Sequence, residues 1–128
     1  MSESNLKSII CKKAKLVSNL ILVRRMSSGN NAGEPDIFGC FNGRHVEIEV
    51  KIGKNQPTKL QYAMLEKWKH YTEIVGCVWS TTDVYYLLQP ACKNSDQQEE
   101  LHKAFYNLKD FAKLYLPNQT TGHIYNAM

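Results

Sequence analysis

Several features that this 128-residue sequence lacks narrow the class of protein. No stretch approaches the roughly 18 consecutive apolar residues of a membrane-spanning helix, so we expect no membrane partner. Charges scattered through the apolar positions of the first residues argue against a signal peptide. The cysteines lie far apart and form no CxxC pair, which indicates neither a disulfide framework nor a zinc site. We therefore expect reduced thiols in a cytoplasmic protein; the cysteines are Cys11, Cys40, Cys77 and Cys92.

Positive charge is in excess, and it is unevenly distributed. The net charge is +4. Residues 1–25 contain a single acid, Glu3. The basic residues of this segment are Lys7, Lys12, Lys13, Lys15, Arg24 and Arg25. Two interpretations remain open, a solvated helix face or a surface that contacts phosphates. The remaining composition, with 43% hydrophobic and 22% charged residues, is ordinary for one soluble domain over 1–128.

Apolar spacing and turn residues predict an alternating series of helices and strands. The elements are a helix over 4–17, strands over 20–26, 36–41 and 45–51, a helix over 58–71, strands over 74–80 and 84–88, and a helix over 97–116. The order is α-β-β-β-α-β-β-α, and either Ser4 or Ser2 caps the first helix. An antiparallel hairpin followed by a strand-helix-strand crossover predicts an α/β fold with a central mixed β-sheet flanked by α-helices.

The hairpin predicted around Asn42-Gly43 brings two acidic residues together. Both turn residues can take positive φ, which a tight hairpin turn requires. Residues opposite each other then sum to about 85, so Asp36 faces Glu49 at roughly 5 Å between Cβ atoms. Two carboxylates that close repel each other unless a cation lies between them, and oxygen ligands suit Mg²⁺ or Mn²⁺. Lys51, one strand step further on, reaches the same place.

The strand over 45–51 has one apolar and one charged face. The alternating residues are Val46, Ile48 and Val50 on one face and Glu47, Glu49 and Lys51 on the other. One interpretation is an amphipathic strand with its polar side in water. The other is a central strand covered on both faces, where buried charges must be paired or bind an ion.

Short motifs in this region resemble a nuclease family. The sequence resembles the PD-(D/E)xK signature at Pro35-Asp36 and at Glu49-Val50-Lys51. Together with a helix bearing Gln61 and the strand in GCVWSTTDV, it is similar to the VRR-NUC branch over roughly 3–88. This branch includes small stand-alone phage and viral proteins and resembles Holliday-junction resolvases. The resemblance implies a restriction-endonuclease-like fold, located in the host cytoplasm if a phage encodes it, and it leaves the helix over 97–116 unmatched.

The resemblance also implies a role for each motif residue. The implied ligands of Mg²⁺ or Mn²⁺ are Asp36, Glu49 and the main-chain carbonyl of Val50. Glu3 resembles a first-helix glutamate that some members turn toward the metal. Lys51 would position or activate the attacking water and stabilise charge at the phosphate, and Gln61 would orient the site. A metal that acidifies bound water and clamps a phosphate gives phosphodiester hydrolysis.

These features together predict a metal-dependent DNA endonuclease selective for a four-way (Holliday) junction or other branched DNA. The residues expected to hold phosphates are Lys12, Lys13, Lys15, Arg24, Arg25, Lys54 and Lys59. Symmetric cutting of two strands calls for a two-fold homodimer, with the apolar stripe of the first or last helix at its interface. Two alternatives remain, a non-catalytic module of the same fold that binds DNA or a partner protein, and an RNA-processing nuclease.

Several residues keep open or structural roles. Glu47 stands where the family has an apolar residue, so it is either an acid close behind the site or a surface residue. We interpret Glu34 as a loop charge rather than an acid near the metal. An ordinary solvated glutamine is the alternative for Gln61, and Trp68 and Trp79 are typical of a core. The histidines show no ligand spacing.

Overall fold

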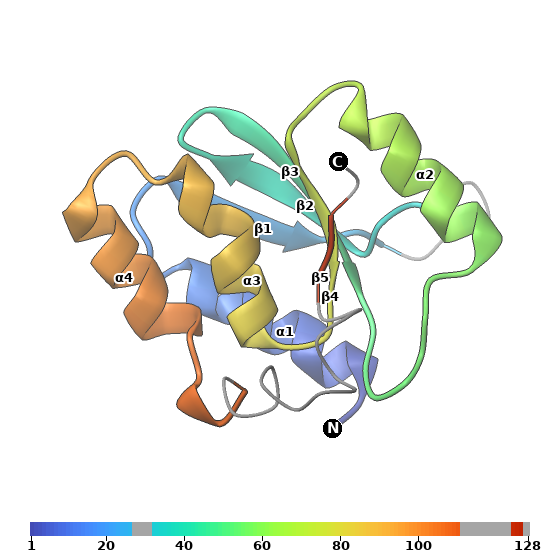
Figure 1. The fold of residues 1–128 in the computed structure, drawn as a ribbon, viewed down its shortest axis with the longest axis horizontal. Helices are drawn as coiled ribbons and strands as arrows, with labels where there is room; N and C mark the ends of the chain where they lie inside the picture. The colour runs from blue at the N-terminus through green and yellow to red at the C-terminus, as the bar shows by residue number, and fades with distance from the viewer. Residues whose placement is uncertain (27–31, 111–123, 127–128) are drawn as a thin grey trace.

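Helices cover both faces of one five-stranded sheet in the computed structural model (Figure 1). The structure describes residues 1–26, 32–110 and 124–126. The helices are α1 (Glu3–Ala14), α2 (Lys59–Lys69), α3 (Thr81–Leu88), α4 (Ser95–Phe105) and the short 3₁₀ helix η2 (Gln89–Ala91). The strands are β1 (Leu20–Arg24), β2 (Ile37–Phe41), β3 (Arg44–Val50), β4 (Ile74–Val78) and β5 (Ile124–Asn126). A helix of the length and apolarity needed to cross a bilayer is absent from these ranges.

The sheet is mixed, as the sequence predicts. Its strands lie in the order β1-β2-β3-β4-β5; β3 runs parallel to β4, and the other neighbours are antiparallel. Helix α2 joins the parallel pair, as a strand-helix-strand crossover requires. The hairpin of β2 and β3 turns at Asn42 (φ 52°) and Gly43 (φ 80°) and pairs Ile37 with Ile48. The predicted turn and register are therefore confirmed.

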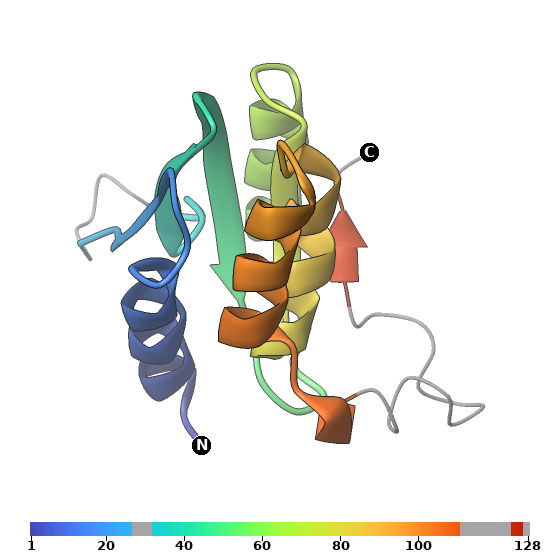
Figure 2. The ribbon, with the colours of Figure 1, turned by 90° about the vertical axis from the view of Figure 1, so that its left-hand side faces the viewer.

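Helices α1, α3 and α4 pack on one face of the sheet, and α2 packs on the other. Strand β3 contributes Val46, Ile48 and Val50 to the main core, where they pack with α1, α3 and α4. On the opposite face, α2 places Leu65 in a small cluster with Cys77 of β4. Figure 1 shows α2 on the other side of β3 and β4 from α3 and α4, and in Figure 2 α4 stands in front with α2 behind. The prediction that β3 is covered on both faces is confirmed.

The segment over 84–88, predicted as a strand, belongs to helix α3. Ser80 accepts a hydrogen bond from the main-chain N–H of Asp83 and caps the start of this helix. Val84 and Leu88 are buried in the core at helical spacing. The aromatic and β-branched composition favours a strand, but packing of one helix face against the sheet outweighs this preference. The predicted order is wrong here, because the α-helices and strands given above follow the order α-β-β-β-α-β-α-α-β within the described residues, and β5 was not expected.

The helix predicted over 97–116 is replaced by a shorter one. Helix α4 begins after Asn94, whose side chain accepts a hydrogen bond from the main-chain N–H of Gln97. The helix ends at Phe105, because Tyr106 takes an extended backbone conformation. Residues 111–116 of the predicted helix lie outside the described residues.

The apolar stripes of the first and last helices face the core. The buried residues of these stripes are Leu6, Ile10 and Ala14 in α1 and Leu101, Ala104 and Phe105 in α4. Packing within the chain therefore covers these parts of both stripes, whereas Leu108 of the predicted last helix is 74% exposed. The rest of that stripe, over 111–115, lies outside the described residues, and a dimer stays a prediction. On the edge strand β1, by contrast, Ile21 and Val23 are 59% and 42% exposed.

Candidate active site

Asp36 and Glu49 lie opposite each other at one end of the central hairpin. Asp36 directly precedes β2, and the register that pairs Ile37 with Ile48 places it beside Glu49 of β3. The main-chain N–H of Val50 donates a hydrogen bond of 2.8 Å to Asp36 Oδ2. This bond fixes Asp36 against the end of β3, so the structure brings the two predicted metal ligands together.

Glu49 is buried between the sheet and α2. Its exposed fraction is 1%, and its register partner on β4 is Cys77. One oxygen, Oε2, accepts a hydrogen bond of 3.2 Å from Gln61 Nε2 and lies 3.9 Å from Lys51 Nζ. The other oxygen, Oε1, is buried without a hydrogen-bond partner among the described residues. Because Glu49 is buried, this face of β3 is not a polar face in water. A carboxylate oxygen left there without a partner is costly unless it is protonated or a cation binds it.

The surroundings of Glu49 make its carboxyl a weak acid. Burial, and after it the charge and close contact of Asp36, raise the pKa of Glu49 to about 9, whereas Lys51 and Lys7 oppose this rise. Without a further cation nearby, the neutral form of Glu49 is therefore favoured at pH 7. A carboxyl perturbed in this way, beside a second acid and two lysines, is more typical of a functional site than of a solvated strand.

A residue that the sequence analysis did not assign to the site, Lys7, contacts Asp36. Its Nζ lies 3.1 Å from Asp36 Oδ1, and each side chain is 20% exposed. Lys7 comes from α1, on the main-core side of the sheet, whereas Gln61 comes from α2 on the other side. The site therefore lies at the end of β3, where side chains from both helical layers meet. Because Lys7 and Asp36 are far apart in the sequence, no local pattern indicated this contact.

The N-terminal cap of α2 holds Gln61 against the site. The Thr58 hydroxyl accepts a hydrogen bond of 3.2 Å from the main-chain N–H of Gln61. In return, Gln61 Oε1 accepts a bond of 2.8 Å from the main-chain N–H of Thr58, which completes a capping box. The amide nitrogen remains free to donate to Glu49. Both the oxygen and the nitrogen of the Gln61 amide therefore make hydrogen bonds within the protein. Gln61 is not an ordinary solvated glutamine.

The residues at this site fit a hard divalent cation. Asp36 and Glu49 supply carboxylate oxygens, and the unpartnered Oε1 of Glu49 is suited to a cation ligand. Among the described residues no group of three His, Cys, Asp or Glu side chains gathers to hold a metal, so Glu3 does not join the pair. Two carboxylates are sufficient for Mg²⁺, which usually keeps several waters and binds substrate phosphates. Val50, whose carbonyl completes the predicted ligand set, follows Glu49 at the end of β3, and its main-chain N–H donates to Asp36.

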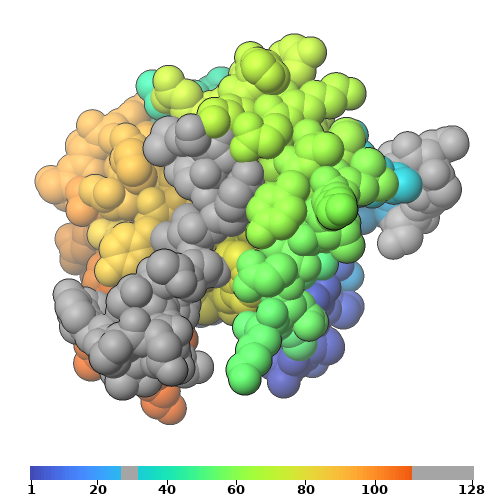
Figure 3. Space-filling view, turned by 45° about the vertical axis from the view of Figure 1, so that its right-hand side comes forward, coloured from blue at the N-terminus to red at the C-terminus, as the bar shows by residue number. Residues whose placement is uncertain are grey.

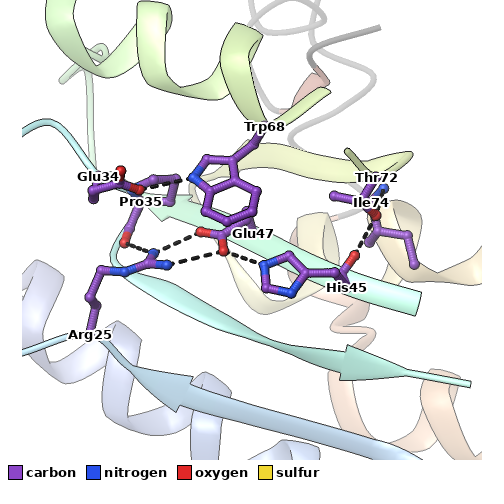
Figure 4. A network of polar contacts seen from close by, with 8 residues as sticks. All are labelled: Arg25, Glu34, Pro35, His45, Glu47, Trp68, Thr72 and Ile74. Atoms are coloured by element: carbon purple, nitrogen blue, oxygen red, sulfur yellow. Dashed lines mark hydrogen bonds and ion pairs between the residues drawn. The ribbon is translucent and has the colours of Figure 1, made fainter. Parts of the chain in front are cut away.

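A buried ion pair behind the site holds the segment that carries Asp36 (Figure 4). Glu47 is fully buried, and Arg25 binds its carboxylate with two hydrogen bonds, of 2.7 and 3.1 Å. The same guanidinium donates to the main-chain carbonyl of Pro35 at 2.8 Å. The main-chain N–H of Arg25 donates to the carbonyl of Asp36 at 2.7 Å. Glu47 is therefore an acid close behind the site and not a surface residue, since it neutralises the arginine that positions the Pro35-Asp36 segment.

Aromatic and acidic side chains extend this network toward α2. The His45 ring contacts Glu47 and stacks on Trp68 at 4.8 Å between ring centroids. The Trp68 indole N–H donates a hydrogen bond of 2.9 Å to Glu34. Figure 4 shows these side chains in a continuous row between the hairpin and α2. Glu34 is thus a loop charge tied to α2, as interpreted from the sequence.

The predicted phosphate-binding residues occupy different environments. Arg24 donates to the hydroxyls of Ser4 and Ser8, so it fastens α1 to β1. The Arg25 guanidinium forms an ion pair with the buried Glu47. Arg25 therefore has a structural role in place of the predicted contact with DNA. The remaining side chains are exposed or half-buried, and they are Lys12, Lys13, Lys15, Lys54 and Lys59. On the surface, the segment over 51–58 lies beside the N-terminal part of the chain (Figure 3).

The cysteines add no chemistry to this site. All four cysteines are free thiols, as expected. Burial raises the pKa of the Cys77 thiol, with the charge of Glu49 as a further cause, so this thiol remains protonated.

Comparison with models of known protein families, with curated proteins and with solved structures found no match. The function is therefore argued from the geometry of the site.

Proposed function

We propose that this protein is a metal-dependent nuclease that hydrolyses phosphodiester bonds in DNA. The observation that carries the proposal is the Glu49 carboxylate, buried beside Asp36 with one oxygen unpartnered. In the charged form such a group is costly unless a cation completes it, and a divalent cation between Asp36 and Glu49 would hold both acids ionised. The similarity of these residues to the PD-(D/E)xK signature supports the same reading.

In this proposal Asp36, Glu49 and the Val50 carbonyl hold Mg²⁺ or Mn²⁺. A bound cation would supply charge neutralisation at the phosphate and would make a nearby water more acidic. Lys51, with its ammonium 3.9 Å from Glu49, would position that water and stabilise negative charge on the phosphate. Gln61 would keep the Glu49 carboxylate turned toward the ion through its hydrogen bond. Arg25 acts indirectly, since it fixes the backbone on both sides of the Pro35-Asp36 peptide.

The substrate would be branched DNA, such as a four-way junction. The exposed Lys54 and Lys59 lie in the segment between Lys51 and Gln61, so they border the site and suit a phosphate backbone. Cutting two strands of a junction symmetrically would require a two-fold homodimer. The free thiols suit a reducing compartment such as the cytoplasm.

The test is cleavage of a labelled panel that comprises single strand, duplex, flap, four-way junction and matched RNA hairpins. Each substrate is incubated with Mg²⁺ or Mn²⁺, with a chelator, and with the variants Asp36→Asn and Glu49→Gln. Asp96→Asn is the matched control, because Asp96 is an exposed acid at the start of α4. We expect junction cleavage that the chelator abolishes and that each site variant lowers by more than about a hundredfold. Tight junction binding without cleavage under any metal would overturn the proposal and favour the binding module.

A further inference from the structure

Lys7 contacts the carboxylate oxygen of Asp36 that accepts no main-chain hydrogen bond from Val50. Asp36 Oδ2 already accepts the main-chain N–H of Val50 at 2.8 Å, whereas Oδ1 lies 3.1 Å from Lys7 Nζ. Lys7 therefore contacts the pair of acids through Asp36.

The helix turn that carries Lys7 is fastened in place. Arg24 of β1 donates to the Ser4 carbonyl at 3.3 Å, to the Ser4 hydroxyl at 3.2 Å and to the Ser8 hydroxyl at 2.8 Å. Ser4 and Ser8 flank Lys7 on α1, and the neighbouring Leu6 is buried in the core. The base of the Lys7 side chain is thus fixed beside the site, while its long stem leaves the ammonium able to move.

We propose that Lys7 is a built-in counter-ion that competes with the divalent cation for Asp36 and, once displaced, binds a phosphate of the DNA. This inference rests on the proposed function. An ammonium and a divalent cation at the same carboxylate oxygen repel each other, so binding of one weakens binding of the other. The lysine is the group that gives way, because its ammonium is carried on a flexible stem, whereas the main-chain N–H of Val50 at Oδ2 is fixed in β3.

A displaced Lys7 links metal binding to DNA binding. Its ammonium remains tethered next to the position where the negative phosphate would lie, and lysine binds phosphate as a point charge. DNA that draws Lys7 away from Asp36 makes the metal site more favourable, and by linkage the metal strengthens DNA binding by the same factor. A partly exposed salt bridge of no functional consequence is the alternative, since such pairs contribute little to stability.

The experiment measures Mn²⁺ affinity by titration calorimetry for the wild-type protein and for Lys7→Gln, Lys7→Met and Lys7→Arg. Lys12→Gln is the matched control, because Lys12 is an exposed lysine on the same helix. Each titration is repeated with a saturating four-way junction whose backbone resists hydrolysis, so that no change is made to the site itself. Circular dichroism shows whether each variant is folded.

We expect Lys7→Gln and Lys7→Met to bind Mn²⁺ about fivefold more tightly than the wild type without DNA. Lys7→Arg and Lys12→Gln keep the wild-type affinity, and DNA tightens Mn²⁺ binding to the wild type more than to Lys7→Gln. Equal affinity of the wild type and Lys7→Gln, both with and without DNA, would overturn the role of Lys7 but leave the nuclease proposal intact. A wild type that binds no Mn²⁺ and cuts no DNA would overturn both.

Discussion

Glu47 and Glu49 stand two positions apart on one face of β3, yet their surroundings differ. Glu47 is fully buried and neutralised by Arg25 at 2.7 Å, with His45 at its other oxygen. Glu49 has one donor, Gln61, at one oxygen and no partner at the other among the described residues. The first acid is therefore a completed ion pair that supports the fold, and the second is an incomplete one that is suited to a cation.

Removing Arg25, which neutralises the buried Glu47, should destabilise the folded protein. We expect Arg25→Met to lower the free energy of unfolding by about 3–5 kcal/mol, because it leaves the Glu47 charge buried without a partner. The double variant Arg25→Met, Glu47→Leu should recover most of this loss, measured by urea denaturation. Arg44→Met is the control, since its ion pair with Glu73 is exposed on the surface. A double variant as unstable as the single one would contradict this account of Glu47.

A buried acid remote from the site, Asp83, should set part of the pH dependence of stability. Burial raises the pKa of Asp83 to about 7, although the N–H of Trp79 opposes the rise. Between about pH 4 and 7 the folded chain holds a proton that the unfolded chain releases, so stability should fall as the pH rises through this window. In Asp83→Asn, which keeps the acceptor for Trp79, this contribution disappears. Unfolding by urea at several pH values measures it, with Asp96→Asn as control, and an unchanged slope would contradict the assignment.

At the scale of elements, the hairpin could be predicted and the helical second half could not. Asn42-Gly43 and strict alternation determine the turn, the register and the approach of Asp36 to Glu49, because these depend on neighbouring residues. The segment over 84–88 is as suited to a strand as to a helix, and only its packing on β4 decides. The contact between Lys7 and the hairpin joins residues far apart in the sequence, so no local pattern reveals it.

The start of α2 allows structural and functional roles to be separated. Thr58→Ala removes the cap of the helix and should lower the free energy of unfolding by about 1 kcal/mol, with little effect on cleavage by the folded enzyme. Gln61→Ala removes part of the same cap together with the bond to Glu49, so it should lower kcat as well. Urea denaturation and single-turnover cleavage measure the two effects. If both variants lost cleavage equally, Gln61 would have no role beyond the helix cap.

At the scale of the whole molecule, two helical layers meet at one end of the sheet. Helix α1 brings Lys7 from one side, α2 brings Gln61 from the other, and the hairpin supplies both acids. The site is thus assembled from elements that fold around the same central strands, which explains why its residues are held without a disulfide. The side chains of Ile21 and Val23 on the edge strand leave an exposed apolar surface outside the site.

The most direct test of the account is a crystal structure of the protein soaked with Mn²⁺, recorded with anomalous diffraction. We predict an anomalous peak for a Mn²⁺ ion that is coordinated by a carboxylate oxygen of Asp36 and by Oε1 of Glu49. Lys7 should have moved away from Asp36. The same peak should be absent in crystals of Glu49→Gln. A well-ordered site that shows no peak between the two acids, at a Mn²⁺ concentration that supports cleavage, would contradict the central claim.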